Sequence, residues 1–142
     1  MEGWDISQQS LHLTSESIKK LGVDTTLALH QRDILSDEDY DGAFDGIVIS
    51  EVLEHIEDPA KGITNIKKFL KPGGFIFINV PCNSPAPDHI HLFSHPDEVR
   101  SLVEEQGLDV IAFESLPMTG YTLDRAIKAK ATISCWAIAQ EP

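Results

Sequence analysis

The chain has 142 residues, of which 42% are hydrophobic and 24% are charged, as in a folded globular domain with a sizeable core. Its 11 basic and 23 acidic residues give a formal net charge of −12, a field that repels phosphate and so disfavours a nucleic-acid partner. No run of 18 apolar residues is present, and the first residues lack a secretion signal, so we expect a cytoplasmic protein with no membrane partner. Cys82 and Cys135 form no CxxC motif, which favours reduced thiols.

The first third of the chain predicts two short strands on either side of a helix. Residues 3–6 form at most the tail of a strand, and Ser7 is a suitable N-cap for a helix that stops at Gly22. A second strand is expected over residues 25–34, followed by an acidic, turn-like segment at residues 36–42.

The most informative stretch follows directly. Residues 46–49 are an uninterrupted apolar run, as expected of a strand that is buried in a parallel sheet. The run ends in the polar segment 50–55, at the carboxyl end of the strand, where ligands bind in open α/β sheets. If Glu51 begins a helical turn, Glu54 and His55 lie on the same face of that turn.

The rest of the chain continues the alternation of helices and strands. Residues 59–70 have the spacing of an amphipathic helix and are followed by a turn signal at residues 71–74. Residues 81–96 form a polar loop with four prolines and three histidines, a length that suggests a functional loop. Residues 114–132 remain ambiguous. The other expected elements are strands at residues 75–80, 108–113 and 133–139 and a helix at residues 96–106.

This order predicts an α/β fold with a Rossmann-like, mostly parallel sheet, helices on both faces and one antiparallel strand near the end of the chain. We expect residues 1–142 to form one domain. The runs at residues 47–49, 75–80 and 108–113 should be neighbouring strands, with the first two parallel.

The order of two motifs resembles the class I S-adenosylmethionine-dependent methyltransferases. These motifs are FDGIVISEVLEHIEDP at residues 44–59 and FLKPGGFIFINVP at residues 69–81, with a helix between them. The resemblance runs from Gly3 to about Phe113. It implies S-adenosylmethionine as cofactor and methyl transfer, which we expect to go to an oxygen of a small-molecule acceptor.

The same resemblance suggests which residues bind the cofactor. GWDIS resembles the family's second strand, whose acidic end residue binds the ribose hydroxyls, and QRDIL resembles the end of the third strand, where an Asp commonly meets the adenine amine. Each of these acids could instead serve only its local structure, for example as an acid that the helix dipole favours. The cofactor-binding candidates are Asp5, Ile6, Asp33, Ile34, Ser50 and Glu51.

Residues 51–55 resemble the Glu-x-x-Glu-His motif of ubiquinone-pathway O-methyltransferases and of small-RNA 2′-O-methyltransferases, and three interpretations stay open. The polar turn could simply face solvent. His55 could act as a general base, which suits an imidazole pKa near ~6.5. Alternatively, two carboxylates and an imidazole could hold Mg²⁺, Mn²⁺, Fe²⁺ or Zn²⁺. The RNA enzymes add a His from the loop after the fifth strand, and His91 is the best-placed candidate here. The metal candidates are Glu51, Glu54, His55 and His91, and the catalytic candidates are His55 and His91.

One part of the family pattern is missing from the sequence. The first strand and its G-x-G-x-G turn should precede GWDIS by about one strand–helix unit, and a βαβ unit takes ~30 residues. We therefore expect the chain to be an N-terminally incomplete methyltransferase domain, although a rearranged sheet or completion by another chain would also explain the gap. The competing interpretation is a truncated, non-catalytic domain that has lost cofactor binding.

Overall fold

The computed structural model describes residues 1–22, 26–36 and 44–142. The chain divides into two compact units, Met1–Asp37 and Glu38–Pro142. Apart from Ser36, the acidic segment expected at residues 36–42 lies outside the described residues.

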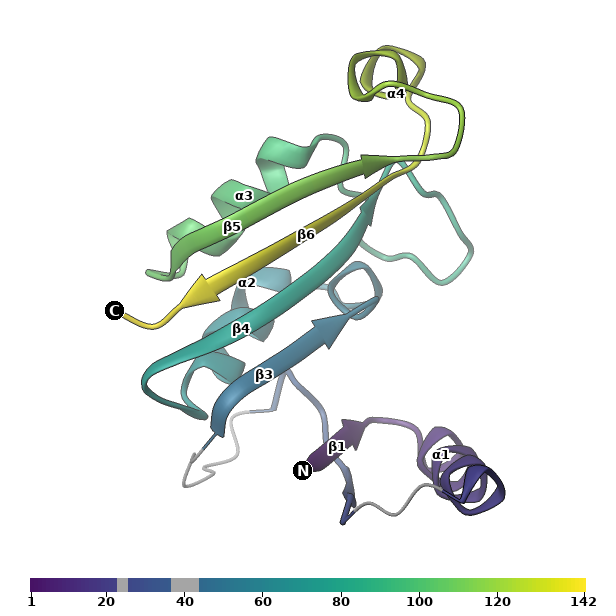
Figure 1. The fold of residues 1–142 in the computed structure, drawn as a ribbon, viewed down its shortest axis with the longest axis vertical. Coiled ribbons are helices and arrows are strands. Elements are labelled where there is room, and N and C mark those ends of the chain that lie inside the picture. Colours follow the sequence, from purple (N-terminus) through teal and green to yellow (C-terminus); the bar gives the residue numbers. More distant parts are fainter. Residues whose placement is uncertain (23–25, 37–43) are drawn as a thin grey trace. The chain divides into compact units, whose positions relative to one another are not determined.

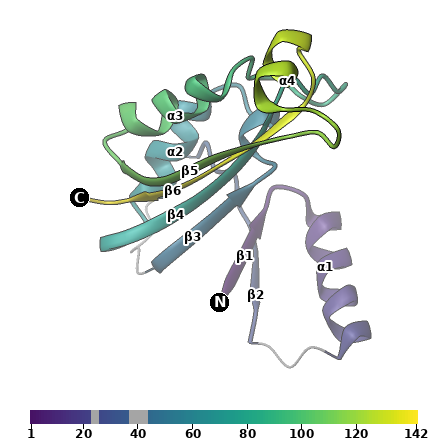
Figure 2. The ribbon, with the colours of Figure 1, turned by 45° about the horizontal axis from the view of Figure 1, so that its top comes forward.

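The smaller unit is a parallel strand–helix–strand arrangement. Strands β1 (Glu2–Asp5) and β2 (Ala28–Gln31) pair in parallel, and helix α1 (Gln8–Leu21) connects them (Figure 2). Ser7 caps the helix, since its side chain accepts a hydrogen bond from the backbone N–H of Ser10, and Gly22 ends it with a φ of 62°. The expected helix is therefore confirmed, and β2 is shorter than the strand predicted over residues 25–34.

The larger unit contains a four-stranded sheet in the order β3-β4-β6-β5. Strands β3 and β4 are parallel, whereas β6 is antiparallel to both of its neighbours, so three of the four strands run in one direction (Figure 1). This confirms the mostly parallel sheet, the parallel pair and the single antiparallel strand. The strands are β3 (Phe44–Ser50), β4 (Leu70–Cys82), β5 (Asp109–Pro117) and β6 (Ile133–Gln140).

One predicted pair of neighbouring strands is wrong, namely the run at residues 108–113 beside the run at residues 75–80. The run at residues 108–113 forms part of β5, and β6 lies between it and β4. Strand β6, the last of the chain, lies between β4 and β5 because it pairs with both of them. Its residue Gln140 lies opposite Phe75 of β4 on one side and opposite Asp109 of β5 on the other.

Helices α2 and α3 cover one face of this sheet, and α4 lies at its end (Figure 1). The core of the unit lies under α2 and α3, where alternate residues of β4 and β6, such as Ile76, Ile78 and Cys135, are fully buried. The helical elements are η1 (Leu53–His55), α2 (Pro59–Lys67), α3 (Pro96–Glu105) and α4 (Leu123–Ala129), the last of which occupies the segment that the sequence left ambiguous.

Helix α2 ends at Lys67, three residues earlier than predicted, because strand pairing begins immediately afterwards. The carbonyl of Phe69 accepts a hydrogen bond from the N–H of Phe44, and Leu70 already pairs with Phe44. The expected turn signal thus lies inside the first part of β4, where Gly73 has a φ of 75° that favours glycine.

Candidate functional site

The predicted polar segment lies at the carboxyl ends of β3 and β4, as expected. Its local backbone differs from the prediction in one respect. Glu51 has a φ of 54°, in the left-handed region, so the helical turn that we expected to begin at Glu51 begins at Leu53 instead. Glu51 is therefore not on the same helical face as Glu54 and His55, and the two carboxylates point to different places.

Glu54 is fully buried, which is rare for a carboxylate. Both of its carboxylate oxygens are shielded from solvent, and no described residue donates a hydrogen bond to either of them. Burial is the main cause that raises the pKa of Glu54 above its usual range; the charge of Glu51 raises it further, while the backbone and two nearby imidazoles oppose the shift. A buried carboxylate without donors normally has a counter-charge or a metal as partner.

Two imidazoles face this carboxylate. The Nε2 atom of His55 lies 3.9 Å from Oε1 of Glu54, and the ring of His89 stands edge-on to that of His55 with a centroid distance of 4.9 Å. Each ring is oriented through its other nitrogen. Nδ1 of His55 lies 2.9 Å from the carbonyl oxygen of Asp88, and Nδ1 of His89 lies 2.6 Å from that of Ser84.

A carbonyl oxygen can only accept, so both Nδ1 atoms donate and both Nε2 atoms are left unprotonated in the neutral rings. This is the arrangement that orients metal-bound histidines, in which the distal N–H donates to a carbonyl or carboxylate. The carboxylate of Asp88, with Oδ2 3.6 Å from the same Nδ1 of His55, adds a negative charge behind that ring.

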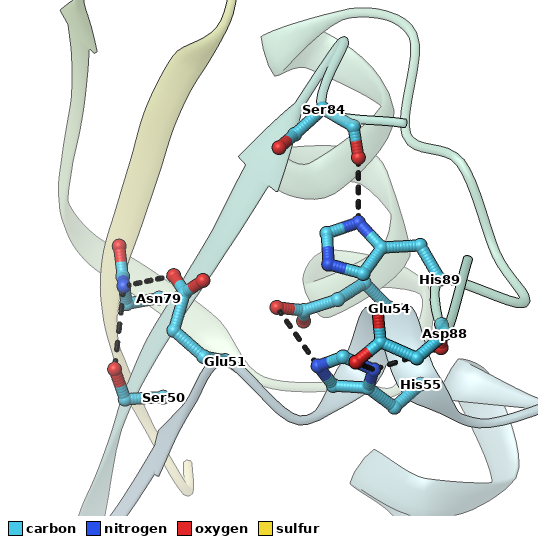
Figure 3. A network of polar contacts seen from close by, with 8 residues as sticks. All are labelled: Ser50, Glu51, Glu54, His55, Asn79, Ser84, Asp88 and His89. Carbon is cyan, nitrogen blue, oxygen red and sulfur yellow. Dashed lines mark hydrogen bonds and ion pairs between the residues drawn. The ribbon is translucent and has the colours of Figure 1, made fainter. Parts of the chain in front are cut away.

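Glu54, His55 and His89 form a group that could hold a metal ion. One ligand atom from each lies within 4.8 Å of the others. Two ligands of an ion at ~2.1 Å are at most ~4.2 Å apart, so a small inward movement would complete the contacts. Figure 3 shows the carboxylate between the two rings, with the Asp88 and Ser84 bonds on their outer sides. We call these three residues the buried cluster, after Glu54; His55 and His89 themselves are only partly buried. Its single carboxylate and two imidazoles are ligands that suit Zn²⁺, Mn²⁺ or Fe²⁺.

Glu51, a metal candidate from the sequence, lies outside the buried cluster. Its carboxylate accepts a hydrogen bond of 2.8 Å from the side-chain amide of Asn79, and the same amide lies 3.3 Å from the hydroxyl of Ser50. The hydroxyl of Ser134 in turn donates to the amide oxygen of Asn79. Ser50 and Glu51, both proposed for cofactor binding, are therefore held by the same side chain of β4, that of Asn79 (Figure 3).

His91 also lies outside the buried cluster, although its backbone N–H donates to the carbonyl of Glu54. Its ring packs on Phe93, and its Nε2 atom is 3.6 Å from a carboxylate oxygen of Glu98. The loop histidine that lies beside Glu54 and His55 is His89, and not His91 as we had predicted. The two histidines lie two residues apart in one loop, so the sequence indicates that a loop histidine is involved but carries no signal for choosing between them.

In the smaller unit, the two acidic candidates lie at the same edge. Asp5 ends β1 opposite Gln31 of β2, two residues before Asp33. Oδ1 of Asp5 accepts from the N–H of Ser7 at 2.7 Å, and Oδ1 of Asp33 accepts from that of Leu35 at 2.8 Å. Each carboxylate thus stabilises a local turn through a hydrogen bond to its Oδ1 atom, and its Oδ2 atom takes no part in that bond. Ile6 and Ile34 follow the two acids directly.

Two further observations concern the cysteines and the possibility of a membrane-spanning helix. Cys82 and Cys135 are both buried free thiols, with their sulfur atoms 3.4 Å apart. Within residues 1–22, 26–36 and 44–142, no helix has the length and apolar character that crossing a bilayer requires.

The model of a family described as "Methyltransferase domain" matches residues 2–113. The chain belongs to this methyltransferase domain family. The match covers both units, from β1 into β5, and it includes the buried cluster.

Curated relatives of this methyltransferase domain are longer than the chain. An uncharacterized methyltransferase of Schizosaccharomyces pombe is 29% identical over 106 residues, which cover 70% of this chain and 37% of the relative. A ubiquinone biosynthesis O-methyltransferase of Methylococcus capsulatus is 26% identical over 140 residues, which cover 83% of this chain and 59% of the relative.

Solved structures share the fold of the methyltransferase domain. The N-methyltransferase NodS from Bradyrhizobium japonicum WM9, in complex with S-adenosyl-L-homocysteine, has a TM-score of 0.69 at 20% identity and covers 99% of this chain and 66% of its own. The [4+2]-cyclase SpnF has a TM-score of 0.78 at 15% identity, with the same two coverages. Because a cyclase shares the fold, the fold alone does not decide the reaction, and the site must be argued from its residues.

Proposed function

We propose that this domain takes part in S-adenosylmethionine-dependent methyl transfer to an oxygen of a small-molecule acceptor, and that Glu54, His55 and His89 hold a divalent metal ion at the acceptor site. The observation that carries the metal proposal is the Glu54 carboxylate, which is fully buried without a hydrogen-bond donor from the described residues. Without an ion, this charge would be among the more expensive groups in the domain.

The donor set fits a metal for two further reasons. Each imidazole donates its Nδ1 hydrogen to a backbone carbonyl, so each would offer an unprotonated Nε2 to an ion. Three protein ligands would also leave coordination positions on the ion open for the oxygens of an acceptor, as in catalytic metal sites. Bound there, the ion would lower the pKa of an acceptor hydroxyl and hold the resulting anion.

The remaining residues of the chain would act on binding and orientation. Asp88 and Ser84 fix the two rings, and Asn79 fixes the carboxylate of Glu51 at the end of β3. We propose Ser50 and Glu51, together with Asp5, Ile6, Asp33 and Ile34, as cofactor-binding residues. Methyl transfer from a sulfonium needs an aligned nucleophile more than a further catalyst, so positioning is the main contribution of such residues.

The printed names of one sequence relative and one solved structure support this proposal. The relative from Methylococcus capsulatus is named as an O-methyltransferase of ubiquinone biosynthesis, and NodS is described in complex with S-adenosyl-L-homocysteine. We extend oxygen as the target atom, and S-adenosylmethionine as the methyl donor, to this chain on that basis. His55 as a metal-free general base is the alternative within the same function, and His91 is the competing loop ligand.

A non-catalytic domain is the second candidate function, because the sequence contains no G-x-G-x-G turn. A transfer assay separates the two. The chain is incubated with catechol as a bidentate oxygen acceptor, with Mn²⁺ or a chelator, and with methyl-labelled S-adenosylmethionine at a concentration high enough to offset the weak cofactor binding that we expect without a glycine-rich turn. Label on a catechol oxygen that disappears with the chelator supports the proposed function, and the Glu54→Gln variant should lose it too. Chelator-resistant transfer favours His55 as a base. No transfer under any condition favours the non-catalytic domain.

A further inference from the structure

The loop that carries His89 leaves the end of β4 through an unusual backbone conformation. Asn83, the first residue after β4, has a φ of 52°, in the left-handed region that residues other than glycine adopt uncommonly. Asparagine is one of the residue types that enter this region most readily. Its backbone makes two hydrogen bonds, whereas no other described residue forms a hydrogen bond with its side chain. Asparagine therefore suits this position through its backbone conformation and not through a side-chain contact.

The backbone of Asn83 also closes the base of the loop. Its N–H donates to the carbonyl of Phe93 at 2.8 Å, and the neighbouring Cys82 forms a β-bridge with Phe93. Its carbonyl accepts a hydrogen bond of 3.3 Å from the hydroxyl of Thr132, the residue before β6. Cys82 and Phe93 are only 0% and 1% exposed, so the base of the loop is anchored in the core. The direction in which residues 84–92 leave the sheet is thus set at Asn83.

A stiff segment carries this direction from Asn83 to His89. A proline follows each of Ser84 and Ala86, and a residue before proline is restricted to extended conformations. The carbonyls of these two restricted residues position His89. That of Ser84 accepts from Nδ1 at 2.6 Å (Figure 3), and that of Ala86 accepts from the backbone N–H at 3.1 Å. A change of the backbone angles at Asn83 would therefore move both acceptors, and His89 with them.

We propose that Asn83 is a positioning residue of the buried cluster, whose left-handed backbone holds the loop so that His89 lies beside Glu54. This inference rests on the proposed function, because it concerns the same metal site. A chain whose loop takes another path lacks one ligand, so the apparent dissociation constant of the ion rises as the fraction of chains with the loop in place falls. The affinity for the ion should thus depend on the backbone freedom of residue 83 and not on its amide group.

A series of substitutions at Asn83 tests this dependence by calorimetric titration with Mn²⁺. Asn83→Gly should bind the ion within about twofold of the wild type, since glycine adopts the left-handed region without a Cβ penalty. Asn83→Ala should bind about fivefold more weakly, and Asn83→Val, with its branched side chain, roughly tenfold more weakly or worse. Binding by Asn83→Val as tight as that of the wild type would overturn the proposal. So would equally weak binding by Asn83→Gly and Asn83→Val, because the amide would then be the group that matters.

Gly73→Ala is the matched control for a general loss of stability. Gly73 lies near the other end of β4, has a φ of 75°, and has open space where a Cβ atom would be placed. Alanine at this position should lower the free energy of unfolding in urea, as Asn83→Ala does, but it should leave the affinity for Mn²⁺ unchanged. An equal loss of affinity in both variants would mean that destabilisation alone weakens binding, and the proposal would be wrong.

NMR of the metal-free chain at alkaline pH separates the role of Asn83 from the metal site itself. In the wild type and in Asn83→Gly, the nitrogen-15 signals of the neutral His89 ring should place its hydrogen on Nδ1, as the contact with Ser84 requires. Asn83→Val should shift the hydrogen towards Nε2, the tautomer that a free histidine ring prefers in water. If this pattern appears but the wild type binds no Mn²⁺, the metal site is refuted and the role of Asn83 stands. If the wild type binds Mn²⁺ and Asn83→Val keeps the Nδ1 hydrogen, only the role of Asn83 is refuted.

Discussion

The substitution Glu54→Gln should change the stability of the chain in opposite directions in the absence and in the presence of a divalent ion. In the metal-free chain, both oxygens of the buried Glu54 carboxylate lack a hydrogen-bond donor among the described residues. Leaving a polar group buried in this way costs ~1–3 kcal/mol, and more when the group is charged. Glutamine keeps the shape and removes the charge, but its amide is also unpaired, so we expect a net gain of about 1 kcal/mol at neutral pH.

The pH dependence follows from the direction of the pKa shift. Burial raises the pKa of Glu54, so the folded chain keeps a proton at pH values where the unfolded chain has released it. The stability that this protonation contributes is fully present below the pKa that Glu54 has in the unfolded chain. It is lost as the pH rises through the higher pKa that Glu54 has in the folded chain. The advantage of Glu54→Gln in the metal-free chain should therefore shrink as the sample is acidified.

A bound ion should reverse the order of stability of the wild type and Glu54→Gln. The wild type gains ~2.7 kcal/mol when the free ion is at 100 times its dissociation constant, because the ion binds only the folded state. Glutamine is a much weaker ligand and should forfeit most of this gain. With Mn²⁺, the variant should thus be less stable than the wild type.

Urea unfolding gives the required free energies. Trp4 belongs to the smaller unit and Trp136 to the unit that contains Glu54, so a Trp4→Phe background makes the fluorescence report on the relevant unit. Glu105→Gln is the matched control, since that exposed carboxylate of α3 lies outside the buried cluster, and it should show neither effect. The reasoning is refuted if Glu54→Gln destabilises the metal-free chain at neutral pH, or if Mn²⁺ stabilises variant and wild type equally.

Two other predictions concern the cofactor and the sheet. The chain should bind S-adenosylmethionine weakly or not at all, because backbone N–H groups of a glycine-rich turn would supply much of the affinity; calorimetry that gives a micromolar dissociation constant would contradict this. Gly46→Ala should destabilise the larger unit by about 1–3 kcal/mol, because a Cβ atom at this position would lie 2.5 Å from the ring of Phe75; urea unfolding would show it, and an unchanged midpoint would mean that the ring moves freely.

Much of the fold could be predicted because it depends on local patterns. Apolar runs with helices between them gave β3, β4 and their parallel pairing, and Gly22 correctly marked the end of α1. The position of β6 between β4 and β5 depends on which strands pair over long distances, and an apolar run carries no information about its partner.

The location of the candidate site and part of its composition could be predicted from the sequence, but its geometry could not. Residues 50–55 do lie at the carboxyl end of β3, and Glu54 and His55 do come together. The left-handed backbone at Glu51 redirects one carboxylate to Asn79, and Glu is not a residue type that signals a positive φ. The choice of His89 over His91 likewise depends on the path of one loop.

Calorimetric titration of the metal-free chain with Mn²⁺ tests the central claim most directly. If Glu54, His55 and His89 hold the ion, the wild type and His91→Ala should each bind one equivalent with similar affinity. His89→Ala and Glu54→Gln should each lose at least tenfold in affinity, because each removes a ligand of the buried cluster. Equal binding by the wild type and His89→Ala, with loss in His91→Ala, would contradict the account and place the loop ligand at His91.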